Sequence, residues 1–392
     1  MVHNVSMHPL VTRIDLDAIA HNTRCIKKHV GDRTLMCVVK ADAYNHGVDA
    51  CVPVMEANGA DAFGVATFAE AREVARHTTK PVLAWLWAPG EEIPAGVEVG
   101  TPSIAHLRSL IDAASTPPTP IPVHLVVDTG MNRSGIDEEA WDEAFALASE
   151  AESQGTLWVK GIMSHLACAD TPEHPFTQEQ LAAFERATQA ARRAGLRPEV
   201  THIANSPGVW TRKDAHLDQV RPGVSLYGSE PVAGQDHGLR PAMSWVARVV
   251  AVKPIARGES VSYGLTWQAP EDGYTALIPA GYADGISRSW QGRFGVTIGG
   301  QWYPQVGRVC MDQIVVWLGG TAGAAEAPVR AGDEAILFGP GGMSADELAT
   351  ATGTISYEVL CAPKGRTVRE YVGRGKRGVE KRYARRTRAK SV

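Results

Sequence analysis

The first two-thirds of the chain alternates between short apolar runs and longer amphipathic runs. The apolar runs are nearly uninterrupted, which is typical of strands covered on both faces. We therefore expect strands at Leu35–Lys40, Ala62–Thr67, Val82–Trp87, Val123–Asp128, Val159–His165 and Val200–Asn205.

The segments between these runs have helical periodicity. We expect helices at Asp17–Val30, Phe68–His77, Ser103–Ala114, Glu138–Ala151 and Thr177–Ala194. Ser103 can cap the free N–H groups of its helix, and Gly195 is a normal helix stop. Strand–helix alternation repeated this often predicts a parallel sheet, here closed into an eight-stranded (β/α)8 barrel of the TIM type.

The pattern changes after about residue 240. Short β-prone segments separated by Gly and Pro predict a mostly antiparallel β domain. These segments are Met243–Val252, Ala276–Pro279, Phe294–Ile298, Trp302–Val306, Gln313–Leu318 and Glu334–Phe338, before a helical pattern at Ser344–Thr350. We expect the barrel in residues 1–240, the β domain in 241–374 and a basic, disordered tail in 375–392.

Composition and charge exclude several classes of protein. The 392 residues are 44% hydrophobic and 21% charged, with a net charge of −4, so neither a disordered chain nor a nucleic-acid binder is indicated. The longest stretch without Asp, Glu, Lys or Arg, Ala113–Val127, is interrupted by prolines and cannot span a membrane. Met1–Leu10 lacks the charged start and the apolar centre of a signal peptide, so we expect a cytoplasmic protein. The six cysteines form no C-x-x-C pair or disulfide framework.

Lys40 is the first residue that points to chemistry. It ends the apolar run Leu35–Lys40, and barrel enzymes place their reactive groups at the carboxyl ends of the strands. Partial burial of an amine lowers its pKa and favours the nucleophilic neutral form. A lysine whose side chain merely extends to solvent at the barrel rim is the alternative interpretation.

The decapeptide VVKADAYNHG around Lys40 closely resembles the cofactor-lysine motif of the alanine racemase family, which has Gly where this chain has Asn45. Eight further segments resemble motifs of that family in the same order. They are Asp128–Gly135, Ser164–Asp170, His202–Ser206, Arg221–Gly228, Val261–Gly264, Gly281–Gly285, Cys310–Asp312 and Ser356–Glu358.

The resemblance implies an isomerase that uses pyridoxal 5'-phosphate to interconvert L-alanine and D-alanine for the cell wall. Racemisation needs proton removal on one face of a carbon and proton delivery on the other. By resemblance, Lys40 carries the cofactor and is the base on the D-alanine side, while Tyr263 is the base on the L-alanine side. The implied cofactor-binding residues are Lys40, Tyr44, Arg133, His165, Asn205, Ser206, Arg221, Gly223, Val224 and Tyr357.

The same resemblance assigns further roles and an assembly. Arg221 would face the pyridine nitrogen and keep it unprotonated, because an arginine does not give up its proton. Arg133 and the backbone N–H of Met311 would bind the substrate carboxylate. Tyr282 and Asp312 would support the site. The implied head-to-tail homodimer would bring Tyr263, Tyr282 and Met311 from the partner subunit.

One position departs from many members of that family. The residue seven positions before Arg133 is usually a lysine that becomes carbamylated and orients the arginine, and this chain has Val126 there. A valine side chain carries no carbamate and accepts no hydrogen bond. A chloride, a water or an acidic neighbour would have to balance Arg133 instead.

Other functions remain open at this point. A broad-specificity or serine racemase of the same fold is the first, because a small pocket discriminates one extra hydroxyl poorly. A barrel-type amino-acid decarboxylase and a non-enzymatic pyridoxal-phosphate carrier are the others. We expect no metal site, because the histidines show no H-x-x-x-H spacing and the cysteines are scattered.

Overall fold

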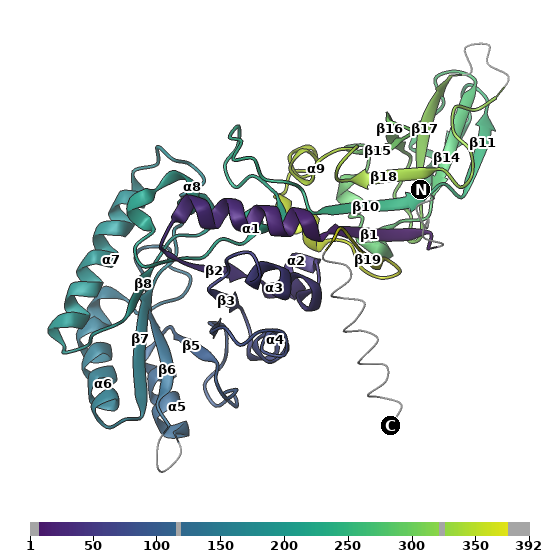
Figure 1. Cartoon of the computed structure of the whole chain (residues 1–392). Coiled ribbons are helices and arrows are strands. Elements are labelled where there is room, and N and C mark those ends of the chain that lie inside the picture. Colours follow the sequence, from purple (N-terminus) through teal and green to yellow (C-terminus); the bar gives the residue numbers. More distant parts are fainter. Residues whose placement is uncertain (1–7, 115–118, 321–325, 375–392) are drawn as a thin grey trace, which may run out of the picture.

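The computed structural model describes residues 8–114, 119–320 and 326–374. The basic tail predicted at 375–392 lies outside the described residues. Figure 1 shows the two parts of the described chain, a barrel surrounded by helices and a β domain at the end of the long helix α1. No helix in the described ranges is long and apolar enough to cross a membrane.

The barrel is an eight-stranded parallel sheet with the strand order β8-β7-β6-β5-β4-β3-β2-β9. Backbone hydrogen bonds from Asp218 to Thr201 (3.2 Å) and from Arg221 to Ala204 (2.9 Å) join its two ends, so the barrel is nearly closed. The strands are β2 (Thr34–Val38), β3 (Ala62–Val65), β4 (Val82–Ala84), β5 (Glu98–Thr101), β6 (Ile121–Val126), β7 (Leu157–Met163), β8 (Val200–His202) and β9 (Gln219–Val220). The predicted barrel is confirmed.

Helices cover the outside of this barrel (Figure 1). Several of their starts are fixed by side-chain caps. Thr67 and Glu70 form a capping box on α4, and Ser103 accepts the His106 N–H on α5 as predicted. The helices are α1 (Leu16–Val30), α3 (Val48–Glu56), α4 (Phe68–Val74), α5 (Ile104–Ala113), α6 (Trp141–Ser153), α7 (Phe176–Arg193) and α8 (Ser206–Thr211).

The barrel interior is divided between an apolar and a polar part. The apolar part consists of the buried side chains of Met36, Ala62, Leu83, Val126 and Met163, with Trp85 packed against them. The polar part contains Glu98, His124 and His202, which are also buried. Buried polar groups of this kind require hydrogen-bond partners, and those partners are described below.

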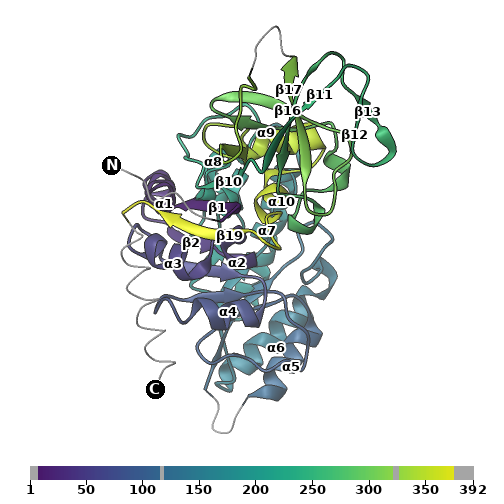
Figure 2. The ribbon, with the colours of Figure 1, turned by 90° about the vertical axis from the view of Figure 1, so that its right-hand side faces the viewer.

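The second domain is a nine-stranded, mostly antiparallel sheet, as predicted, with the order β11-β14-β17-β16-β15-β18-β10-β1-β19. Figure 2 shows it stacked above the barrel with α9 and α10 beside it. Its elements are β10 (Met243–Arg248), β11 (Ala251–Ile255), β14 (Gly273–Ile278), β15 (Gly295–Ile298), β16 (Gln301–Val306), β17 (Ile314–Gly320), β18 (Glu334–Phe338), α9 (Ala345–Thr352), α10 (Ser356–Cys361) and β19 (Val368–Val372), beside the two-stranded β12 (Ser260–Val261) and β13 (Trp267–Gln268).

The first strand differs from the predicted division, which placed all of residues 1–240 in the barrel. Strand β1 (Leu10–Asp15) lies in the second sheet, antiparallel to β10 and parallel to β19 (Figure 1). Arg13 on this strand donates two hydrogen bonds to Glu334, at 3.0 and 2.6 Å. Local sequence cannot show this pairing, because the partners of β1 are more than 200 residues away.

Candidate active site

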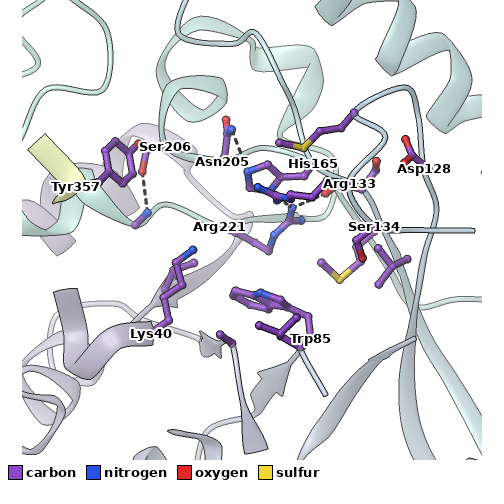
Figure 3. Close-up of a pocket in the computed structure, with 18 of the residues that line it drawn as sticks. Lys40, Trp85, Asp128, Arg133, Ser134, His165, Asn205, Ser206, Arg221 and Tyr357 are labelled. Atoms are coloured by element: carbon purple, nitrogen blue, oxygen red, sulfur yellow. Dashed lines mark hydrogen bonds between the residues drawn. The ribbon is translucent and has the colours of Figure 1, made fainter. Parts of the chain in front are cut away.

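A pocket opens at the carboxyl ends of the barrel strands, where barrel enzymes place their chemistry. Figure 3 shows Lys40 and Arg221 pointing into it, with Trp85 beneath. Its lining residues are Val38, Lys40, Tyr44, Ala66, Trp85, Leu86, Val126, Asp128, Met131, Arg133, Ser134, Met163, Ser164, His165, Asn205, Ser206, Arg221, Gly223 and Tyr357. The structure thus brings together nine of the ten cofactor-binding residues that the resemblance implies, all except Val224.

Lys40 is positioned by an unusual left-handed turn. It begins α2 (Lys40–Asn45), in which Ala41 to Asn45 have φ between 51° and 65°. This conformation costs an L-residue about 1–2 kcal/mol, so five in succession need support from outside the turn. Asp42 accepts the Val48 N–H at 2.8 Å and pairs with Arg369 at 2.8 Å. Contacts with the second domain therefore hold the lysine turn in place.

Burial and charge both act on the Lys40 amine. Burial lowers its pKa first, and the nearby positive charge of Arg133 lowers it further. The smaller influence of Glu70 acts in the opposite direction. A lowered pKa increases the neutral fraction of the amine near neutral pH, which is the form that attacks a carbonyl.

Arg221 lies buried at the centre of the pocket and stays charged. Burial lowers its pKa to about 9, which still leaves a cation at neutral pH. It donates to the Ser164 carbonyl and, at 2.8 Å, to His202 Nδ1. His165 lies 3.5 Å from its Nη2, and burial lowers the pKa of His165 to about 3, with the cationic neighbours acting in the same direction. The neutral His165 therefore adds no positive charge.

A second group of residues forms a cradle of hydrogen-bond donors. The Gly223 N–H donates to Ser206 Oγ at 2.7 Å. A Cβ at Gly223 would overlap the Tyr44 hydroxyl, so only glycine leaves this space open. Tyr357 joins the cradle, and burial raises its pKa to about 12, which keeps its hydroxyl protonated. This arrangement suits an anion held by neutral donors.

Two neighbouring residues stand apart from the donors of the cradle. Asn205 is the N-cap of α8, and its side chain accepts the Gly208 N–H at 3.2 Å, so Ser206 Oγ is left to accept the Gly223 N–H. Val224 is buried at the start of the following turn and is not among the residues that line the pocket.

Arg133 lies at the rim of the pocket. In the described part of the chain it makes no ion pair or hydrogen bond, so no acidic neighbour at ion-pair distance takes the place of the missing lysine. Val126 lines the pocket as part of the apolar half of the barrel. The nearby Asp128 instead accepts the backbone N–H groups of Gly130 and Asn132, at 2.7 and 3.2 Å.

The predicted residues of the second domain are not brought to this pocket within one chain. Tyr263, Tyr282 and Met311 are 71%, 40% and 52% exposed, and none lines it. Asp312 pairs with Arg366 at 2.8 Å, and Arg366 also holds the buried Asp284. The Tyr282 N–H bonds to the Cys310 carbonyl at 3.0 Å, which keeps the Tyr282 and Met311 segments side by side. These residues form an ordered, open surface.

Sequence reasoning missed several lining residues. Asp128, Met131 and Ser134 fall in a motif that was noted for Arg133 alone. Trp85 and Leu86 directly follow β4, and the rule that barrel chemistry lies at the carboxyl ends of strands could have found them.

The fold and the pocket define a two-domain barrel enzyme with a partly buried lysine at the barrel mouth and a group of hydrogen-bond donors beside it. The family model for the alanine racemase N-terminal domain matches residues 14–231, and that for the C-terminal domain matches residues 242–371. An alanine racemase of Corynebacterium efficiens is 53% identical over 377 residues, which is 94% of this chain and 100% of that protein.

Solved structures agree with these matches. An alanine racemase from Corynebacterium glutamicum is 46% identical, with a TM-score of 0.84 over 93% of this chain and 100% of that one. An alanine racemase from Bartonella henselae, solved with covalently bound pyridoxal phosphate, is 28% identical, with a TM-score of 0.83 over 93% of this chain and 99% of that one. The chain belongs to the alanine racemase family.

Proposed function

We propose that this protein interconverts L-alanine and D-alanine with pyridoxal 5'-phosphate, in the cytoplasm, as a homodimer with shared active sites. The observation that carries the proposal is the meeting of Lys40, Arg221 and the Ser206–Gly223 cradle in one pocket of a family member. The covalently bound cofactor of the Bartonella henselae relative supports the choice of cofactor.

The pocket fits this cofactor by its own chemistry. The space that a Cβ at Gly223 would fill, the Gly223 N–H and the hydroxyls of Ser206, Tyr44 and Tyr357 suit a phosphate group. Lys40 would hold the cofactor covalently, because its lowered pKa favours the attacking amine. When bound, pyridoxal phosphate withdraws electrons from the substrate α-carbon and makes its proton removable.

The remaining residues would orient the groups and move the protons. Arg221 would direct its guanidinium at the pyridine nitrogen and leave that nitrogen unprotonated. Arg133, which has no carboxylate partner in the described chain, would bind the substrate carboxylate together with the Met311 N–H. Lys40 would exchange a proton on one face of the α-carbon, and the partner's phenol at position 263 would do so on the other.

The homodimer explains why Tyr263 is so exposed. A single chain presents one base in a pocket and the other on an open surface of the second domain. A C₂ arrangement would place each surface on the partner's pocket, and C₂ dimers are the commonest assemblies. Tyr282 and Asp312 would support Tyr263 and Met311 across that interface.

Incubation with L-alanine in heavy water tests the proposal. We expect the holoenzyme to form D-alanine and to exchange the α-hydrogen of both enantiomers for deuterium, as measured by chiral chromatography and mass spectrometry. Parallel reactions with L-serine, L-ornithine and diaminopimelate measure substrate breadth. Release of carbon dioxide, or cofactor absorbance without turnover, would overturn the proposal in favour of a decarboxylase or a carrier.

A further inference from the structure

A continuous line of hydrogen-bonded side chains crosses the barrel beneath the pocket. It begins at Glu98, the first residue of β5, and ends at Arg221, which follows β9. Glu98 Oε2 lies 2.9 Å from His124 Nε2, His124 Nδ1 lies 2.8 Å from His202 Nε2, and His202 Nδ1 lies 2.8 Å from Arg221 Nη1. All four residues are at most 5% exposed, so their hydrogen bonds are shielded from bulk water.

The direction of every bond follows from the arginine. A guanidinium only donates, so His202 Nδ1 must accept, and the proton of the neutral ring lies on Nε2. That N–H donates to His124 Nδ1, which fixes the proton of the His124 ring on its own Nε2. The Nε2–H of His124 then donates to the Glu98 carboxylate. Each residue can adopt only one protonation form without placing two donors or two acceptors together.

The line also connects the buried Arg221 cation to a carboxylate of opposite charge, Glu98. The atoms that accept from Arg221 are the carbonyls of Ser164 and Ile203 and the imidazoles of His202 and His165, all neutral groups. Within the described chain no carboxylate pairs with Arg221 directly. The carboxylate that ends the line is Glu98, and it also accepts from Lys160.

The charge on Glu98 is maintained by its donors. Burial is the largest single influence and would raise the pKa of its carboxyl group, but the hydrogen bonds and the electrostatic attraction of His124 and Lys160 together bring the pKa below its usual value. Lys160 is more exposed than Glu98, with side-chain exposures of 19% and 7%. The line thus extends from a lysine near solvent to the arginine in the pocket.

We propose that Glu98 and His124 are positioning residues, which fix the orientation of the Arg221 guanidinium through His202 and supply its distant negative charge. For the reaction this role rests on the proposed function, because Arg221 matters there as the partner of the pyridine nitrogen. The line transmits orientation and not protons. Passage of a proton would require His202 as a cation, and burial and the neighbouring Arg221 charge hold the pKa of His202 well below its usual value.

Nitrogen NMR of the histidine-labelled holoenzyme tests the bond directions without reference to catalysis. We expect both His124 and His202 to be neutral at pH 7 with the proton on Nε2. The His124→Gln variant assigns the signals. An imidazolium, or a proton on Nδ1 of either ring, would overturn the proposal. This measurement does not depend on turnover. A protein that does not racemise alanine would therefore contradict the proposed function but not the proposed bond directions.

A pair of substitutions at His124 tests the positioning role. Glutamine offers a carbonyl oxygen toward His202 and an amide N–H toward Glu98, so His124→Gln preserves both bonds but cannot carry a proton. Leucine preserves neither. We expect His124→Leu to lower kcat by about 10–100-fold and to shift the cofactor absorption spectrum, and His124→Gln to stay within about 3-fold with an unchanged spectrum.

The control for general damage is His216→Leu, since His216 is another buried histidine, bonded to the Val209 carbonyl outside the pocket. We expect this variant to lose stability but to keep the cofactor spectrum. Equal losses in the glutamine and leucine variants, or no loss in either, would overturn the proposal. If His124→Leu fails to fold, the NMR result and the glutamine variant still test the proposal.

Discussion

The barrel and the second domain contribute very different surfaces to the site. On the barrel, Lys40, Arg221 and Ser206 are at least partly buried, and Arg221 and Ser206 are held by hydrogen bonds. On the second domain, Tyr263 and Met311 lie on short turns and are more than half exposed. One chain therefore assembles by itself the half of the site that would hold a cofactor. The half that would complete the acid–base pair stays on an exposed surface of the same chain, and in the proposed dimer it would meet the pocket of the partner subunit.

The largest expected effect tests whether the two halves come from different chains. Lys40→Ala and Tyr263→Phe should each lower racemisation by about 10²–10⁴-fold, because each removes one of the two proposed bases. Mixed dimers of the two variants contain one intact site. Random mixing should restore about a quarter of the wild-type activity.

The mixing experiment requires that the two variants be co-expressed with different tags, so that the doubly tagged dimer can be purified. A mixture of wild type and Lys40→Ala is the control, because it gives the activity expected for one working site. If the doubly tagged dimer remains as inactive as its parents, both bases belong to the same chain and the comparison above fails.

The second prediction separates cofactor binding from proton transfer. Gly223→Ala places a methyl group against the Tyr44 hydroxyl, and Tyr44 cannot easily move because its ring stacks on Tyr227 at 4.9 Å. We expect the Kd for pyridoxal phosphate to rise by about 10–100-fold. Tyr263→Phe should leave this Kd within about 3-fold. Fluorescence titration of the apoproteins measures the two Kd values. A raised Kd in the Tyr263 variant alone would contradict the separation of cofactor binding from proton transfer.

The two domains should also differ in their response to acid. Burial lowers the pKa of His46 and of His165 from 6.5 to about 3, and burial lowers that of His202 as well. All three lie in the barrel, and residues 241–374 contain no histidine. Because the unfolded chain binds these protons first, their contribution is complete above pH 6.5 and is lost as the pH falls toward 3.

Each of these histidines should lower the free energy of unfolding by up to about 1.4 kcal/mol per pH unit in that window. Hydrogen exchange at pH 7.5 and 5.5 should show the barrel opening more readily at the lower pH, with a smaller change in the second sheet. His46→Gln should reduce the dependence, whereas Trp158→Phe, which removes no titratable group, should not. Equal acid sensitivity of both sheets would count against this assignment.

Much of the barrel was predictable because its signals are local. Strands β2 and β6 are short and largely apolar runs, and their ends place Lys40 and Asp128 at one rim. Strands β1 and β19 were not found, because their pairing depends on residues far along the chain. Strand β9 has only two residues and gives no periodic signal.

The residues of the site also separate into those that local sequence predicts and those that it does not. Lys40, Ser206 and Gly223 follow from motifs and strand ends, and the structure brings them together. The line from Glu98 to Arg221 could not be predicted, because its four members lie on or beside four different strands and only closure of the barrel aligns them. Backbone conformation was equally hidden, since the decapeptide around Lys40 gives no sign of a left-handed turn.

The smallest expected effect comes from the left-handed turn Lys40–Asn45, where the barrel contacts the second domain. Asn45 has φ of 65°, donates to the Pro363 carbonyl at 2.8 Å and accepts from Arg369 at 3.0 Å. Asn45→Ala loses both bonds and keeps the strain, whereas Asn45→Gly loses both bonds and relieves it. The glycine variant should therefore be more stable than the alanine variant by about 1 kcal/mol, and less stable than wild type. Urea unfolding of the three proteins measures the order, and an alanine variant as stable as the glycine variant would show that the left-handed turn is not strained.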